Sequence, residues 1–142
     1  MQQRSILIVE DEAIVAMDLR AQLQKLGYKI CGTAGTASEA KSLVERLKPD
    51  LALMDIQLQG PEDGISAAQA ICQRHRVPVI FLTAFSDEDT VRRAAGTAAY
   101  GYLTKPFQIK ELRAGIEIAL SKAAMERQLR EADLWFVHTL RC

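Results

Sequence analysis

The sequence has few of the features that mark specialised classes of protein. It contains three cysteines, Cys31, Cys72 and Cys142, and no Cys-x-x-Cys pair, so neither a zinc site nor a disulfide framework is indicated and we expect a reducing, cytoplasmic location. No apolar run approaches the roughly 20 residues that span a bilayer, so we expect no membrane partner. Lysine plus arginine equals aspartate plus glutamate at 18 each, so no excess of one charge points to direct contact with nucleic acid.

Short apolar runs alternate with longer amphipathic stretches in a chain of 142 residues, which is long enough for one domain with a substantial core. Five runs are mostly apolar and too short for helices, so we expect strands over residues 5–9, 29–34, 51–54, 77–82 and 100–103. Between and after them, apolar residues recur at helical spacing. We expect five helices, over residues 14–26, after a cap at Ser38, over residues 65–74 and 88–98, and from residue 109 onward.

The alternation of strands and helices predicts an α/β fold. Strands that are apolar on both faces indicate a parallel sheet with helices on each side. Because crossover connections are right-handed, we expect a doubly wound, flavodoxin-like sheet of five parallel strands in the order 2-1-3-4-5, with five helices of which the last is extended. Such sheets bind ligands beyond the carboxyl ends of their strands.

Polar side chains follow four of the five expected strands, at the point where each strand ends. These side chains belong to Glu10 and Asp11 after the first strand, Asp55 after the third, Thr83 after the fourth and Lys105 after the fifth. Because the carboxyl ends of parallel strands open on one edge of the sheet, we expect three carboxylates, a hydroxyl and an ammonium to meet in one cleft.

Clustered carboxylates repel one another and need a counter-charge. A hard divalent cation such as Mg²⁺, with oxygen ligands, supplies it. We expect Asp11 and Asp55 to be direct ligands, Glu10 to act through a bound water, and the backbone carbonyl of Gln57 to supply a further ligand. The sequence therefore predicts a site for Mg²⁺ or another divalent cation.

A carboxylate beside such a metal can also be a nucleophile that forms an acyl phosphate. Phosphoryl transfer depends mainly on positioning and on neutralising the equatorial oxygens. The metal would hold one oxygen, the ammonium of Lys105 a second, and the hydroxyl of Thr83 with the amide of Ala84 a third. The small side chain of Ala84 leaves room for the phosphoryl group.

Four stretches of the sequence carry a resemblance to a known family. They are ILIVEDE (residues 6–12), LALMDIQ (51–57), FLTA (81–84) and YLTKPF (102–107). Together they resemble, in order and spacing, the receiver domain of two-component response regulators. The resemblance covers about residues 4–122, and it departs from the family in having Glu10 where aspartate is commoner.

The resemblance implies a role for each residue of the cleft. Asp55 would accept a phosphoryl group from a histidine kinase, Glu10 and Asp11 would be the acidic pair, and Lys105 would contact the phosphate. Thr83 and Tyr102 would form a switch, in which the hydroxyl moves towards the acyl phosphate and the tyrosine ring fills the vacated space. The altered surface would comprise the fourth helix, the fifth strand and the last helix. Tyr102 as a plain core residue is the alternative.

The last helix extends beyond the expected receiver domain (residues 1–122). From residue 109 its pattern runs past Ala132, with one apolar stripe at Leu112, Ile116, Ala119 and Ala123 and a second at Met125, Leu129, Ala132 and Phe136. Residues 123–142 are either a linker helix or a coiled-coil seam that forms a homodimer. Residues 131–140 are similar to the segment that opens PAS domains, so we expect a PAS, sensor or kinase output domain downstream in a longer protein.

Three alternative functions are weighed against the receiver domain. A phosphatase of the haloacid dehalogenase type would carry Asp-x-Asp on its first strand, whereas the candidate nucleophile here follows the third. A nucleotide-binding Rossmann domain would have glycines after the first strand, where this chain has acids. A scaffold receiver that no longer takes phosphate would lack an acid, the acceptor or the lysine. We therefore expect no enzyme activity other than the domain's own phosphorylation and dephosphorylation.

Overall fold

A five-stranded parallel sheet forms the centre of the computed structural model, which describes residues 3–56, 58, 64–83, 92 and 100–141, with residues 133–141 described by their helical backbone alone. The strands are β1 (Ser5–Val9), β2 (Lys29–Ala34), β3 (Leu51–Asp55), β4 (Val79–Thr83) and β5 (Gly101–Thr104). They lie in the order β2-β1-β3-β4-β5, and each neighbouring pair is parallel. The predicted flavodoxin-like sheet is therefore confirmed.

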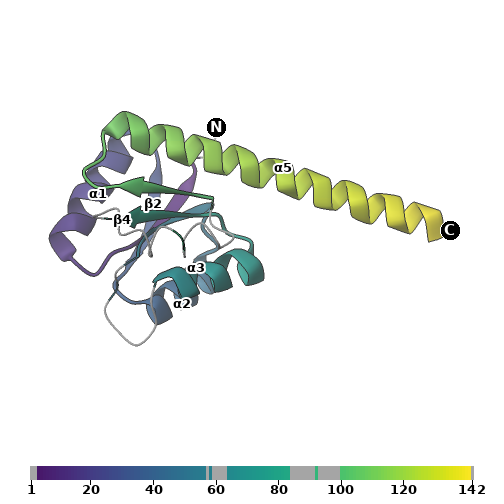
Figure 1. Cartoon of the computed structure of the whole chain (residues 1–142), viewed down its shortest axis with the longest axis horizontal. Coiled ribbons are helices and arrows are strands. Elements are labelled where there is room, and N and C mark those ends of the chain that lie inside the picture. The colour runs from purple at the N-terminus through teal and green to yellow at the C-terminus, as the bar shows by residue number, and fades with distance from the viewer. Residues whose placement is uncertain (1–2, 57, 59–63, 84–91, 93–99, 142) are drawn as a thin grey trace.

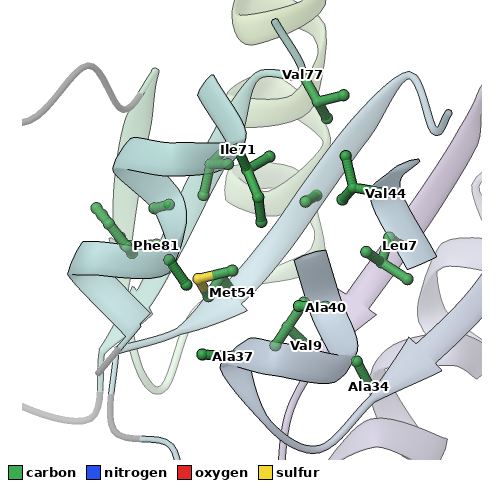
Figure 2. Packing of buried hydrophobic residues seen from close by; sticks show 14 of the residues in the cluster. Leu7, Val9, Ala34, Ala37, Ala40, Val44, Met54, Ile71, Val77 and Phe81 are labelled. Carbon is green, nitrogen blue, oxygen red and sulfur yellow. The ribbon is translucent and has the colours of Figure 1, made fainter. Parts of the chain in front are cut away.

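Helices pack on both faces of this sheet (Figure 1). One face carries α1 (Ala13–Lys25) and α5 (Ile109–Arg141), and the other carries α2 (Ala37–Leu47), α3 (Gly64–Ala70) and the π-helical turn η1 (Ile71–His75). Because successive side chains of a strand point to opposite faces, each central strand contributes to two cores. Leu7, Val9, Met54 and Phe81 pack under α2 and α3, as Figure 2 shows, while Ile6, Ile8, Leu53 and Leu82 pack under α1 and α5.

Several element boundaries differ from those expected. The strand β4 begins at Val79 rather than at residue 77, because Pro78 has no amide hydrogen for the ladder and contributes only its carbonyl, which accepts from the amide of Ala52 at 3.0 Å. The helix α2 is capped by Thr36, whose Oγ1 accepts from the Glu39 amide at 3.2 Å, so the expected cap at Ser38 was wrong. The expected fourth helix lies outside the described residues apart from Arg92, which is helical.

The helix α5 is 33 residues long, or about 50 Å at 1.5 Å per residue. Its first apolar stripe packs on the sheet as expected, since Leu112, Ile116, Ala119 and Ala123 are all buried. Beyond that stripe the helix projects away from the body of the domain (Figure 1). Among the described helices, none combines the length and apolar character needed to cross a membrane.

Candidate functional site

Two of the predicted acids follow β1 and are held close to the sheet. The amide of Glu10 donates to the carbonyl of Ala34 at 2.8 Å, which continues the pairing of β1 with β2 by one residue. The side chain of Glu10 turns inward and leaves the residue only 4% exposed, and its Oε1 accepts from the Glu12 amide at 3.2 Å. Asp11 is half-buried, and its carboxylate lies close to those of Glu10 and Asp55.

Asp55 is the last residue of β3 and is half-buried. It lies opposite Leu82 of β4, and the next amide, that of Ile56, donates to the Leu82 carbonyl at 3.2 Å. Gly64 packs directly against this turn, and a Cβ added to it would come within 2.6 Å of the Asp55 carbonyl oxygen. No sequence pattern singled out Gly64, because this constraint on the backbone of the candidate nucleophile depends on how two segments of the chain approach each other.

Lys105 reaches into the cleft from the end of β5. Its amide donates to the carbonyl of Thr83 at 2.6 Å, and the Lys105-Pro106 peptide bond that follows is cis. The Nζ of Lys105 lies 3.3 Å from Asp55 Oδ2 and 3.4 Å from Glu10 Oε2. Thr83 itself is 7% exposed at the end of β4. The structure therefore brings together all five residues that the sequence placed in the cleft.

The carboxylates and the ammonium perturb one another strongly. The pKa of Glu10 is raised to about 7, chiefly by burial. A hydrogen bond with Asp55 and the negative charge of Asp55 also raise this pKa, whereas the Glu12 amide and the charge of Lys105 lower it. Burial lowers the pKa of Lys105, but the attraction of Asp55 and Glu10 outweighs it, so the pKa of Lys105 lies above its ordinary value. The lysine is therefore a permanent cation, whereas Glu10 is poised to exchange its proton near neutrality.

The acidic cluster has the donor set for a hard divalent cation. Oxygen atoms of Glu10, Asp11 and Asp55 all lie within 4.8 Å of one another, which allows a single ion to contact more than one of them. Two further predicted contacts, the carbonyl of Gln57 and the amide of Ala84, lie outside the described residues. Carboxylate oxygens and no sulfur or imidazole make this set suitable for Mg²⁺.

Tyr102 lies on β5, paired with Phe81 of β4, and its ring points out of the core. It is 52% exposed, so its alternative interpretation as a plain core residue was wrong. The buried hydroxyl of Thr83 and the exposed ring of Tyr102 thus lie on adjacent strands, near the ends where the cleft opens.

The comparisons with known proteins all indicate the same family. The sequence matches the family described as the response regulator receiver domain over residues 6–117. It is 46% identical over 119 residues to the transcriptional regulatory protein PdtaR of Mycobacterium tuberculosis, a match that covers 84% of this chain and 58% of PdtaR. The chain therefore spans less than two thirds of the length of that relative.

Solved structures resemble the fold over nearly their whole length. The signal receiver domain of a modulated diguanylate cyclase from Desulfovibrio desulfuricans G20 has a TM-score of 0.83 and 38% identity, with 88% of this chain and 99% of that chain covered. The receiver domain of a sensor histidine kinase from Pseudomonas aeruginosa PAO1 has a TM-score of 0.76 and 30% identity, with 84% and 99% covered. That structure has a magnesium ion coordinated in its active-site cleft.

Proposed function

Because this chain belongs to the family of response regulator receiver domains, it acts in two-component phosphorelay signalling, and we propose that Asp55 is the residue that accepts the phosphoryl group. The observation that carries the proposal is the position of the Asp55 carboxylate between an acidic metal site and an ammonium. Carboxylate oxygens of Glu10 and Asp11 lie within 4.8 Å of one of its own, and Lys105 Nζ lies 3.3 Å from its Oδ2.

In this proposal each residue of the cleft has a separate role in phosphoryl transfer. A carboxylate oxygen of Asp55 forms the new P–O bond while the P–N bond of a phosphohistidine donor breaks and the imidazole leaves with the electron pair. The ammonium of Lys105 neutralises one phosphoryl oxygen, and the hydroxyl of Thr83 donates to another. Asp11 and Asp55 would hold Mg²⁺ directly, with Glu10 behind them, and the bound ion would supply positive charge to a phosphoryl oxygen.

The same geometry supports an acceptor rather than an enzyme that turns over external substrates. The nucleophile stands on the third strand and is followed two positions later by Gln57, so the Asp-x-Asp arrangement of a haloacid dehalogenase phosphatase is missing at this position. We propose that the domain catalyses only its own phosphorylation and dephosphorylation. Sustained hydrolysis of a generic phosphate ester such as p-nitrophenyl phosphate would contradict this.

The switch belongs to the same proposal. In the structure Thr83 is buried and Tyr102 is half-exposed on the next strand, so an inward turn of the ring would bury apolar surface once the hydroxyl moves to the phosphoryl group. The residue before β5, Tyr100, donates its hydroxyl to Glu126, and Lys122 Nζ lies 5.2 Å from the centre of its ring. A movement of β5 would therefore reach α5 around residues 122–126.

An exposed apolar stripe runs along the same helix from Ile118 to Ala132, and we propose that it is a homodimer seam. Ile118, Met125 and Leu129 are 65%, 63% and 64% exposed, and their spacing of seven and four residues continues to the exposed Ala132. The exposure of Ile118 supports extending the stripe expected from the sequence by this residue, so the proposed seam would begin before residue 122. This spacing is that of a coiled coil.

The seam is tested by measuring mass in solution with light scattering. We expect a dimer for the wild type and a monomer for Leu129→Glu, because a buried carboxylate opposes the seam. The variant Ile14→Glu is the matched control, since Ile14 is 83% exposed on α1 and away from the stripe. A wild-type chain that is monomeric at every concentration would contradict the seam.

The output is proposed to lie beyond the receiver domain. The family match ends at residue 117, while α5 continues as one helix to Arg141. We propose that this continuation carries the signal to a PAS, sensor or kinase domain of a longer cytoplasmic protein, and that the donor is a histidine kinase. The test is to fuse the chain to such a domain and to measure the activity of that domain with and without phosphorylation. An activity that does not change on phosphorylation would contradict this proposal.

The acceptor is tested by labelling with acetyl phosphate and Mg²⁺, followed by intact-mass spectrometry. We expect one phosphoryl group on the wild type, one on Asp18→Asn and none on Asp55→Asn. Asp18 is the matched control because it is an exposed aspartate on α1, hydrogen-bonded to Gln22. Stoichiometric labelling of Asp55→Asn would contradict the proposal.

A further inference from the structure

A second hollow lies at the opposite edge of the sheet from the phosphorylation cleft. It has a volume of roughly 380 Å³ and is bordered by the segments that lead into β3 and β4 and by α5. The charged and polar residues that line it are Lys48, Asp50, Arg74, His75, Arg76 and Arg127, together with Glu45. The hollow therefore combines side chains from three separate parts of the chain, around residues 44–50, around residues 74–78 and at Arg127.

The cations of this hollow are not neutralised by ion pairs within the described residues. None of the carboxylates described comes within 4.0 Å of a side-chain nitrogen of Lys48, Arg74, Arg76 or Arg127. Asp50 is already engaged, since its Oδ2 accepts from the amide of Ser5 at 2.8 Å and its Oδ1 lies 4.0 Å from Arg4. Three arginines and one lysine thus line the hollow together with two carboxylates, one of which already has partners outside it.

Helix ends account for only some of these cations. Lys48 is the C-cap of α2 and Arg76 that of η1, and a positive charge at a helix carboxyl end is favourable. Arg127 has no such explanation, because α5 continues past it to Arg141. Arg127 lines the same hollow as Arg74 and Arg76, which come from a different element, and arginine side chains are suited to binding phosphate oxygens.

The floor of the hollow is apolar. It is formed by Val44, Pro49, Val77 and Pro78, all of which are buried, whereas Lys48, Arg74, Arg76 and Arg127 are exposed. A ligand with a flat apolar part and a phosphorylated part matches both surfaces, and the volume falls within the range of ~300–1,000 Å³ of small-molecule sites.

We propose that this hollow binds a small phosphorylated ligand of nucleotide size, with its phosphates on Arg74, Arg76 and Arg127 and its ring on the apolar floor. The site is independent of the phosphorylation cleft, since the two lie at opposite edges of the sheet. It gives the receiver domain a second input besides phosphorylation.

The proposal is tested by NMR titration of ¹⁵N-labelled chain with ADP, in EDTA so that the metal site does not contribute. We expect saturable shifts of the Lys48, Arg76 and Arg127 amides, weaker binding of pyrophosphate than of ADP because it lacks the ring, and loss of affinity as salt is raised. Asp55→Asn should bind ADP as the wild type does.

Variants separate the site from general attraction to a charged surface. Arg127→Gln should weaken ADP binding by about tenfold, because a charge-assisted bond to phosphate is lost. Lys110→Gln is the matched control, an exposed cation of α5 roughly 25 Å along the helix from Arg127, and it should leave binding unchanged. Equal weakening by both variants, or binding of ADP no stronger than that of sulfate, would overturn the proposal.

Discussion

The side-chain ammonium of Lys105 lies 3.3 Å from Oδ2 of Asp55, although 50 residues separate them in the sequence. The contact joins the end of β5 to the end of β3, two strands that are not neighbours in the sheet. The same Nζ lies 3.4 Å from Glu10 Oε2, so one cation serves both acids. Lys105 therefore compensates the charge that a divalent cation or a phosphoryl group would meet in the cleft.

Replacing Lys105 should separate metal binding from phosphoryl transfer. In Lys105→Gln we expect phosphorylation by acetyl phosphate to slow by on the order of 100-fold, because a preorganised positive charge on the phosphoryl oxygens is lost. We also expect Mg²⁺ to bind several-fold more tightly, because the ammonium that repels it is gone. Stopped-flow phosphorylation and calorimetric Mg²⁺ titration measure the two effects.

The control for this prediction is Lys25→Gln, which removes an exposed cation at the end of α1. It should leave both quantities unchanged. If Lys105→Gln weakened Mg²⁺ binding, or left the rate of phosphorylation unchanged, the role given to Lys105 would be refuted.

Mg²⁺ binding should depend on pH near neutrality through Glu10. The pKa of Glu10 is raised to about 7, so the proton competes with the cation below that pH. We expect affinity to be about tenfold lower at pH ~6 than at pH ~8, since each unit below the pKa costs a factor of ten. The groups that face Glu10 are Asp55, which raises its pKa, and Lys105, which lowers it.

The folding stability of the metal-free domain should also depend on pH through Glu10. Because the folded-state pKa of Glu10 lies above the ordinary 4.5, the folded state binds the proton more tightly than the unfolded state. Stability should therefore fall as pH rises from about 4.5 to about 7, and Glu10→Gln should remove this slope in chemical denaturation. The variant also tests the predicted pH dependence of Mg²⁺ binding. If Mg²⁺ affinity were as pH-dependent in Glu10→Gln as in the wild type, the competing proton would belong to another residue.

Gly64 should prove essential to the position of Asp55. A Cβ at this residue would lie 2.6 Å from the Asp55 carbonyl and 3.0 Å from that of Ile56, and backbone cannot yield as a flexible side chain does. We expect Gly64→Ala to destabilise the domain by ~1–3 kcal/mol and to slow phosphorylation. Urea unfolding and the acetyl phosphate assay measure these effects.

Gly101→Ala is the matched control for Gly64→Ala. A Cβ at Gly101 would meet nothing within 4 Å, so its stability and rate of phosphorylation should stay near those of the wild type. Equal effects of the two substitutions would mean that the close approach to Asp55 is unimportant.

Thr83 should be needed for the response to phosphorylation more than for phosphorylation itself. In Thr83→Ala, Asp55 should still be labelled, while the phosphate-dependent shifts of β5 and α5 amides in NMR spectra should shrink, because no hydroxyl follows the phosphoryl group. Thr83→Ser keeps the hydroxyl and should retain most of the response. Identical responses in wild type and Thr83→Ala would rule out the switch.

The sequence predicted the sheet and the cleft because both follow from local patterns and one topological rule. Runs such as residues 5–9 and 51–54 are apolar on both faces, and parallel strands bring the residues after them to one edge. The sequence could not predict the packing of Gly64 on Asp55 or the outward ring of Tyr102, because each depends on how distant segments of the chain approach one another. The cap at Thr36 was missed because two hydroxyl residues compete within three positions.

The measurement that tests the central claim most directly is localisation of the acyl phosphate by borohydride reduction. The wild-type chain would be labelled with acetyl phosphate and Mg²⁺, reduced, digested and sequenced by mass spectrometry. Reduction converts a phosphorylated aspartate to homoserine, so our account predicts homoserine at position 55 and unchanged acids at positions 10 and 11. A reduced acid at position 10 or 11, or at any site other than Asp55, would contradict the account.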